Sequence, residues 1–405
     1  MRVLVTTLGS PSHGRAQLPL VRALAAGGHT VQVVTTPIIA SVFAREDVRV
    51  AALLPDVMPG YREVPRLQAL AAREDLDEEQ RAQQMKELMV SGLSRSMALD
   101  LRRVLLPVVE DFAPDLILRD GMDLGSVLIG EARGIPQLPT PSGASNSLDP
   151  ADLLPGLNAS RTEQGLPVRE DPLSIVPFGR IDCVPEAYSF AQFLPGARTY
   201  RQALAVDRAL ALPDWVAQLP TDRPLVFASI GTAAPLMLQW GLETDSGAMP
   251  LPMPHPEESL RTILRAAALL EECTVLVTSM GLTVDVADLP SHVRVTERLP
   301  QPLLLETVDL FLTHGGFNSV RESMRTGTPM AVLPQFGDQH PNAQRVEELG
   351  LGRHVADATP QGIADTCRAV LADRTIAAGV RRAHLAMLAL PDIEHAVADL
   401  VELVG

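Results

Sequence analysis

The chain has 405 residues, of which 46% are apolar and 20% are charged. This length is too great for one ordinary hydrophobic core and predicts two domains of about 200 residues each. The formal net charge of -15 opposes nucleic acid as a partner, because binding to it draws most of its affinity from clustered Lys and Arg.

No apolar run reaches the ~18 residues of a membrane span, and the apolar part of MRVLVTTLGSP is too short for a signal peptide. We therefore expect a cytoplasmic protein with no membrane partner. The three cysteines, Cys183, Cys273 and Cys367, are far apart and form no C-x-x-C pair. They are expected to be reduced, packed thiols.

The first 140 residues alternate short apolar runs with helical patterns. The expected strands are MRVLVTT, VQVVTT, PDLILRD and IPQLPT, and the expected helices are GRAQLPLVRALAAGGH and GSVLIGEARG. Such alternation indicates a parallel sheet covered on both faces.

Residues from about 55 to 110 interrupt this pattern with a polar loop and a long helical stretch. An insertion of this kind can hold variable substrate contacts. Its methionines Met85, Met89 and Met97 could line an apolar pocket, but their helical spacing favours core packing.

A second series of strands begins at RPLVFASIGT. It continues through CTVLVTSM, HVRVTERL, VDLFLTHGG and TPMAVLP, with helical patterns between most of them. The chain therefore belongs to the α/β class, with two doubly wound domains. Because ligands of open parallel sheets bind at the carboxyl ends of the strands, we expect the site in a cleft between the domains.

The expected organisation is an N-terminal domain over 1–205, a linker over 206–222 and a C-terminal domain over 223–385. A last helical segment, 386–405, could pack back on the first domain. Residues 235–258 form a long connection, rich in Pro and Met, that carries Trp240. We interpret it as a flap over the cleft, with plain disorder as the alternative.

The stretch THGGFNSVRESMR places His314, Gly315 and Gly316 between a buried strand and a helix. Backbone N–H groups and the positive end of a helix bind phosphate at such a point. The glycines let the backbone approach a diphosphate, and His314 can donate a hydrogen bond. The simpler alternative is a capping box made by Ser319 and Glu322, which explains neither His314 nor the distant GDQ.

The pattern T-H-G-G-x-N-S-x-x-E is followed by G-x-P, and then by D-Q sixteen residues after the Glu. It resembles the donor-site signature of inverting nucleotide-sugar glycosyltransferases with two facing Rossmann-like domains, the GT-B type. The likeness covers nearly the whole chain, since LPDWVAQLPTDRPLVFASIGT resembles that family's hinge and first donor-domain strand, and RLPQPLLL resembles its W-x-P-Q segment. The natural-product branch, including enediyne (calicheamicin-type) enzymes, is the nearest in character.

This resemblance implies which residues bind the donor. Glu322 would meet a ribose or deoxyribose hydroxyl, and Asp338 and Gln339 would face the sugar. Arg298 stands where many relatives have a base-stacking Trp, so the base would lie against its guanidinium or against Leu299. The implied donor-binding residues are Gly231, Thr232, Arg298, Leu299, His314, Gly315, Gly316, Asn318, Ser319, Glu322, Asp338 and Gln339.

His13, in the loop after the first strand, matches the histidine that serves as general base in this family. An acceptor hydroxyl must lose its proton as it attacks, and an imidazole with an ordinary pKa of about 6.5 can take it. Asp120, at the same sheet edge, matches the aspartate that orients the base. Asp123 is the competing carboxylate, and a helix N-cap is the alternative role for Asp120. His29 is expected at a helix end, away from the site.

The resemblance thus implies an inverting, metal-independent transferase that moves a sugar from a TDP or UDP carrier to a hydroxyl of a hydrophobic natural-product aglycone. No cofactor beyond the nucleotide sugar is expected. A nucleotide-sugar 2-epimerase and a non-catalytic nucleotide-sugar-binding helper are the alternatives. A hydrolase is less favoured, because the chain lacks a G-x-S-x-G elbow. The sequence identifies neither the sugar, the acceptor nor the oligomeric state.

Overall fold

The computed structural model describes residues 1–55, 64–73, 75–141, 146–194, 196–201, 203, 210–236, 238 and 254–405. The chain divides into two compact units. The first comprises Met1–Arg201 and Pro391–Gly405, and the second comprises Gln202–Leu390. Each unit is built on its own parallel sheet, which confirms the α/β class predicted from the sequence.

The first unit has a five-stranded parallel sheet in the order β3-β2-β1-β4-β5. Its strands are β1 (Arg2–Thr6), β2 (Thr30–Thr35), β3 (Arg49–Ala52), β4 (Leu116–Arg119) and β5 (Gln137–Pro139). The strand order reverses between β1 and β4, which pair directly through Val3 and Leu116. Ligands of open α/β sheets bind beyond the carboxyl ends of the strands at such a reversal.

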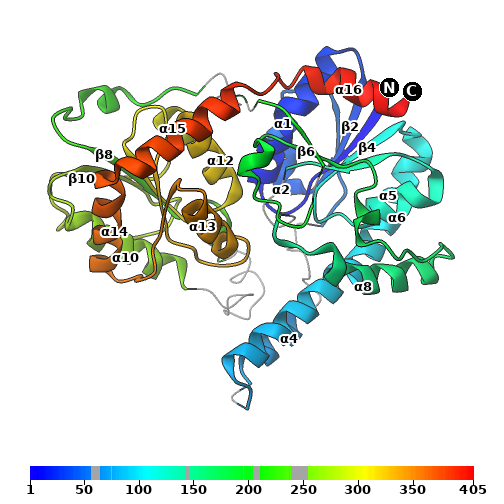
Figure 1. The fold of residues 1–405 in the computed structure, drawn as a ribbon, viewed down its shortest axis with the longest axis horizontal. Coiled ribbons are helices and arrows are strands. Elements are labelled where there is room, and N and C mark those ends of the chain that lie inside the picture. Colours follow the sequence, from blue (N-terminus) through cyan, green and yellow to red (C-terminus); the bar gives the residue numbers. More distant parts are fainter. Residues whose placement is uncertain are drawn as a thin grey trace. The chain divides into compact units, whose positions relative to one another are not determined.

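Helices cover this sheet. They are α1 (Pro11–Ala26), α5 (Ala98–Phe112), α6 (Gly125–Arg133), α8 (Pro150–Glu163) and the C-terminal α16 (His395–Val404), with the short α2 (Pro37–Ala40). A two-stranded sheet, β6 (Arg180–Asp182) with β7 (Ala197–Thr199), completes the unit. Helix α16 packs on α1 (Figure 1), and the Tyr200 hydroxyl donates a 2.6 Å hydrogen bond to Asp399 of α16.

The insertion before α5 contains α3 (Val64–Ala71), α4 (Glu78–Ser91) and a π-helical turn, Gly92–Met97. Helix α4 extends away from the rest of its unit (Figure 1), and none of its described side chains is buried. Met97 packs on the core of the unit, as the helical spacing predicted, whereas Met89 is exposed.

The second unit has a six-stranded parallel sheet in the order β10-β9-β8-β11-β12-β13. Its strands are β8 (Leu225–Ser229), β9 (Thr274–Thr278), β10 (Val293–Thr296), β11 (Leu310–Thr313), β12 (Met330–Val332) and β13 (Gly352–His354). The covering helices are α10 (Pro256–Ala268), α11 (Gln301–Leu304), α12 (Phe317–Thr326), α13 (Gln339–Glu348), α14 (Pro360–Ala372) and α15 (Arg374–Leu388). The strand order here reverses between β8 and β11.

The expected linker and flap lie partly outside the described residues. Of the linker 206–222, residues 206–209 are not described, and the partly buried Trp215 packs against the hydrophobic cluster of the second unit that contains Phe227. Of the flap 235–258, residues 237 and 239–253, with Trp240, are not described.

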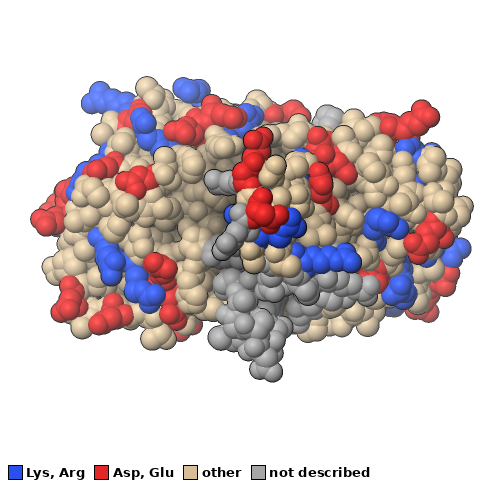
Figure 2. Space-filling view, turned by 90° about the horizontal axis from the view of Figure 1, so that it is seen from below, with Lys and Arg blue, Asp and Glu red and all other residues tan. Residues whose placement is uncertain are grey.

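All three cysteines are buried free thiols, as predicted. Within the described residues, no helix is both long and apolar enough to cross a membrane. Acidic and basic side chains are interspersed over the face shown in Figure 2 and do not gather by sign.

Candidate active site

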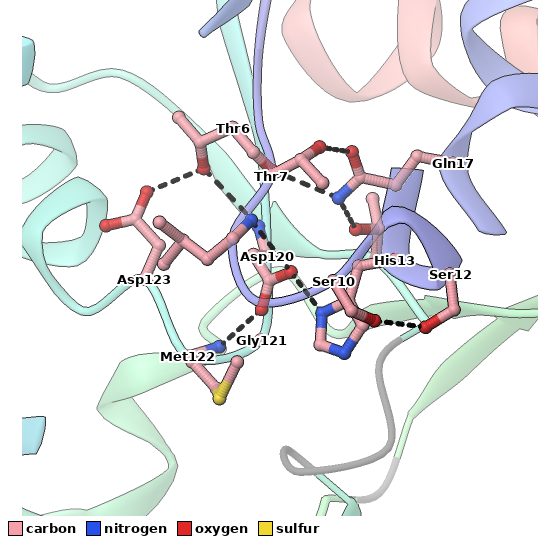
Figure 3. Close-up of polar contacts among 12 residues, drawn as sticks. Thr6, Thr7, Ser10, Ser12, His13, Gln17, Asp120, Gly121, Met122 and Asp123 are labelled. Carbon is pink, nitrogen blue, oxygen red and sulfur yellow. Dashed lines mark hydrogen bonds and ion pairs between the residues drawn. The ribbon is translucent and has the colours of Figure 1, made fainter. Parts of the chain in front are cut away.

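His13 and Asp120 meet at the carboxyl edge of the first sheet (Figure 3). His13 lies in the first turn of α1, and Asp120 directly follows β4. The imidazole Nδ1 and the carboxylate Oδ2 are 2.8 Å apart, with 17% of the His13 side chain exposed and Asp120 fully buried. The fold therefore brings together two residues that are 107 positions apart in the chain.

The carboxylate of Asp120 is held by backbone N–H groups. Met122 donates to Oδ1 at 3.0 Å, and Leu8 donates to Oδ2 at 3.4 Å. The N–H of Asp120 donates to the carbonyl of Thr6 in β1 at 2.9 Å. The N-cap of α6 is Leu124, so the alternative role of Asp120 as a helix cap is wrong.

Asp123, the competing carboxylate, has other partners. It accepts hydrogen bonds at 2.6 Å from the hydroxyls of Thr6 and Ser126, and at 3.0 Å from the Ser126 N–H. Burial raises the pKa of Asp123, and the bonds from Ser126 and Thr6 oppose this rise. Asp120 is therefore the carboxylate that pairs with His13, while Asp123 fixes the start of α6.

Gln17, one helical turn after His13, fixes α1 on the sheet and was not singled out from the sequence. Its amide donates to the Thr6 carbonyl at 3.0 Å and to the Thr140 hydroxyl at 2.6 Å, and it accepts from the Thr7 hydroxyl. Its position on the buried face of an amphipathic helix was the available signal. His29 lies just beyond the end of α1, as expected, and its Nδ1 is 3.1 Å from the amino group of Met1.

In the second unit, the ring of His314 lies against two glycines. A Cβ atom on Gly231 would be 2.3 Å from His314 Cε1, and one on Gly316 would be 2.4 Å from Nε2. Gly231 also has a φ of +74°, where L side chains are strained. A Cβ on Gly315 would lie 2.6 Å from Val332. These three positions therefore require glycine for reasons of packing.

His314 itself carries a buried ring nitrogen. Its Nδ1 has no hydrogen-bond partner within the part of the chain that the structure describes. Burial lowers the pKa of His314 to about 4, and the carbonyl of Ser229 opposes this shift only in part. The ring is therefore neutral at pH 7. An orphaned buried nitrogen at a helix start calls for a ligand or water atom as its partner.

Acid is expected to destabilise the fold through His314. Between about pH 6.5 and 4 the unfolded chain binds a proton that the buried imidazole does not. The contribution is intact above pH 6.5, and about 3 kcal/mol of the free energy of unfolding is lost by pH 4. Urea unfolding of the wild type and of His314→Gln over this range measures it, because all other titrating groups are common to both. If the free energy of unfolding fell equally with pH in both proteins, the lowered pKa of His314 would be contradicted.

Helix α12 does not begin with the capping box that the sequence suggested as an alternative. Its N-cap is Gly316, which makes no side-chain cap, so the Ser319–Glu322 capping box is wrong. Both residues lie inside the helix and are bridged by Gln301 of α11, whose amide donates to the Ser319 hydroxyl at 3.2 Å and to the Glu322 carboxylate at 2.7 Å. Gln301 was missed, although RLPQPLLL was noted for its resemblance.

The start of α13 is tied to the glycine loop. Asn342 donates to the Gly315 carbonyl at 2.9 Å and to the Asp338 carboxylate at 3.1 Å. The side-chain oxygen Oε1 of Gln339 accepts from the backbone N–H of Gln335 at 2.8 Å. Asp338 and Gln339 are thus brought beside the glycine loop. Asn342, four residues into the segment that D-Q opens, was also missed.

The remaining predicted donor residues lie at the carboxyl edge of the same sheet. Thr232 follows β8, and Asn318 is in the first turn of α12. The Arg298 side chain is 66% exposed, with Nε 3.4 Å from the Glu297 carboxylate. Leu299 packs on the core of the second unit. In the described residues, no group of three or more His, Cys, Asp or Glu side chains could hold a metal ion.

Comparisons with known proteins point in one direction. The model of the erythromycin biosynthesis protein CIII-like C-terminal domain matches residues 261–403. NDP-glycosyltransferase YjiC of Bacillus subtilis (strain 168) is 25% identical over 351 residues, 78% of this chain and 81% of that protein. L-demethylnoviosyl transferase of Streptomyces niveus is 25% identical over 368 residues, 87% of this chain and 84% of that protein.

Among solved structures, spinosyn rhamnosyltransferase SpnG matches with a TM-score of 0.75 and 23% identity, over 99% of this chain and 100% of that chain. SpnG has also been solved with thymidine diphosphate and with the spinosyn aglycone. The structural likeness shows the fold, two Rossmann-like halves of the GT-B type. The matches in sequence support a glycosyltransferase related to the antibiotic and natural-product enzymes.

Proposed function

We propose that this chain is an inverting glycosyltransferase that moves a sugar from a TDP or UDP carrier to a hydroxyl of a natural-product aglycone. The observation that carries the proposal is the His13–Asp120 contact of 2.8 Å, at the sheet edge that the general base of such an enzyme would occupy. The glycine-lined His314 in the second unit supports a diphosphate site. The bound thymidine diphosphate and aglycone of SpnG support these two classes of substrate.

The first unit would activate the acceptor. Because Asp120 contacts Nδ1, we assign the acceptor proton to Nε2 of His13. As the O–H bond breaks, the acceptor oxygen attacks the anomeric carbon, and the bond from that carbon to the diphosphate oxygen breaks with inversion. The Asp120 carboxylate stabilises the imidazolium that forms.

The second unit would hold the leaving diphosphate. We assign the single proton of the neutral His314 ring to the orphaned Nδ1, which would then donate to the diphosphate, and the N-terminal end of α12 would meet its negative charge. Glu322, oriented by Gln301, would accept a hydrogen bond from a hydroxyl of the ribose or deoxyribose of the nucleotide. These groups can meet the charge by themselves, which is why we propose a reaction without a metal ion. A TDP-linked deoxysugar is the donor we favour, and the enediyne resemblance remains a prediction.

Nucleotide binding tests the proposal directly. TDP or UDP at about 100 times its dissociation constant should stabilise the protein by about 2.7 kcal/mol and raise the melting temperature by a few degrees. ADP serves as the control nucleotide, and the rise should persist in EDTA. No response to TDP or UDP would sink the donor assignment, and a rise that EDTA abolishes would sink the metal-free site.

Turnover is then tested with TDP- and UDP-sugars and a panel of hydroxylated aglycones, by mass spectrometry of the products. A glycosylated aglycone supports the proposal. An epimerised sugar nucleotide formed without any acceptor would instead identify a 2-epimerase.

A further inference from the structure

Arg119, the last residue of β4, is a cation buried next to the His13–Asp120 pair. Its side chain is only 1% exposed, and the other residues of the strand, Leu116 to Leu118, are apolar and buried. Taking a guanidinium out of water costs several kcal/mol unless its donors are satisfied. Core packing alone would be served by an apolar side chain, so we expect a functional role for this charge.

The guanidinium donates to four acceptors on three segments. Nε donates to the Gln137 side chain at 2.6 Å, and Nη2 donates to the Ile175 carbonyl at 2.9 Å. Nη1 donates to the carbonyls of Asp120 and Gly121, at 3.3 and 3.1 Å. The bonds of Nη1 hold the short turn whose next N–H, that of Met122, donates to the Asp120 carboxylate (Figure 3).

A purely structural tie between these segments does not need Arg119. Gln137 already links β5 to the Ile175 carbonyl through its own amide, at 2.9 Å. What Arg119 adds is its pair of bonds to the Asp120–Gly121 backbone.

The positive charge of Arg119 lies near two buried carboxylates. All four of its acceptors are neutral groups. Burial lowers the pKa of Arg119 to about 10, and the nearby carboxylates of Asp123 and Asp120 oppose that fall. The guanidinium therefore stays protonated at neutral pH. It supplies positive charge where the carboxylates of Asp120 and Asp123 are buried.

We propose that Arg119 is a positioning residue for glycosyl transfer: it holds the Asp120–Gly121 backbone so that the carboxylate bonds His13 while His13 takes up the acceptor proton. The inference rests on the proposed role of His13 as the general base. Arg119 touches neither substrate and acts through Asp120.

The variant Arg119→Lys keeps the positive charge and removes the fork that binds the two carbonyls. We expect kcat to fall about ten- to a hundred-fold, since small displacements of catalytic groups cost this much. KM for the donor should stay within about twofold, because the implied donor residues all lie in the second unit.

Arg161→Lys is the matched control. Arg161 is as buried as Arg119 and lies in the same unit, where it bonds the Glu131 carboxylate at 2.9 and 2.8 Å. Its replacement should lower the melting temperature and leave kcat unchanged. An equal fall in kcat in both variants would mean that Arg119 has a merely structural role.

Proton NMR provides a readout that needs no turnover. A hydrogen bond from an imidazole N–H to a carboxylate shifts its proton far downfield. Such a resonance should be present in the wild type, absent in His13→Ala, and moved upfield or broadened in Arg119→Lys, with no change in Arg161→Lys. If the wild type transferred no sugar, this spectrum would still decide the positioning role, so the two failures are distinguishable.

A double-mutant cycle completes the test. In an Asp120→Asn background, Arg119→Lys should lower kcat little further, because both changes act through one carboxylate. Independent, multiplicative losses would overturn the proposal. If Arg119→Lys does not fold, Gln137→Leu removes the Nε acceptor together with the bond from Gln137 to the Ile175 carbonyl, and leaves both Nη1 acceptors in place. It should shift the resonance in the same direction to a smaller extent; an unchanged resonance there would also overturn the proposal.

Discussion

Replacing His13 with alanine is expected to lower kcat by about a hundred- to ten-thousand-fold, the usual contribution of a general base. The His13 imidazole bonds Asp120 at this edge of the first sheet, and imidazole is a common general base in enzymes. Donor affinity should stay nearly intact, because the residues implied in donor binding belong to the second unit. Initial rates and TDP titrations of the same preparation measure both quantities.

His29→Ala is the control for this prediction. His29 belongs to the same unit and contacts the amino group of Met1, beyond the far end of the helix that carries His13. Its replacement should leave kcat near the wild-type value. The acceptor must be an aliphatic alcohol, because an acidic phenol needs little help to lose its proton. Near-normal transfer by His13→Ala to such an alcohol would remove His13 from the catalytic role.

The sequence predicted most of the sheets, because buried parallel strands are continuous apolar runs. The run LFLT in β11, for example, is buried at every position. Strand β3 was not predicted, since its four residues RVAA are mostly exposed and lack both an apolar run and a clear alternation. Strand β13 is only three residues long and has a single buried position.

The sequence also allowed us to predict that His13 and Asp120 lie close together. Both follow strands of one parallel sheet, and the carboxyl ends of such strands lie at one edge. The residues that hold this pair in place could not be predicted from the sequence. Gln17 and Arg119 act through partners in distant segments, Thr140 and Ile175 respectively, and no local pattern predicts such bonds. A polar residue inside an apolar stretch was the only local signal.

The helix start at Gly316 shows where local pattern reasoning failed. Ser319 and Glu322 have the spacing of a capping box, but the backbone becomes helical already at Phe317. Their polar groups are used instead by Gln301, which comes from a segment 18 residues earlier than Ser319. Tertiary hydrogen bonds thus outweighed a local motif, and α12 has Gly316 of the glycine loop as its N-cap.

Gly231→Ala is expected to weaken the binding of TDP or UDP about ten- to a hundred-fold. The added Cβ would lie within 2.8 Å of three atoms of the His314 ring, so the ring has to move. A displaced ring loses its bond to the diphosphate, and hydrogen bonds to charged groups are worth about 1.5–3 kcal/mol. The variant also strains the backbone at a φ of +74°, at a cost of about 1–2 kcal/mol.

Gly350→Ala separates the two effects. Gly350 has a φ of +65° in the same unit, and a Cβ there would meet nothing within 4 Å. It should therefore lose a similar amount of stability through strain and bind the nucleotide as the wild type does. Isothermal titration of both variants, each checked for its melting temperature, compares them. Equal affinity in Gly231→Ala and Gly350→Ala would mean that the His314 ring does not contact the diphosphate, because only the first substitution displaces it.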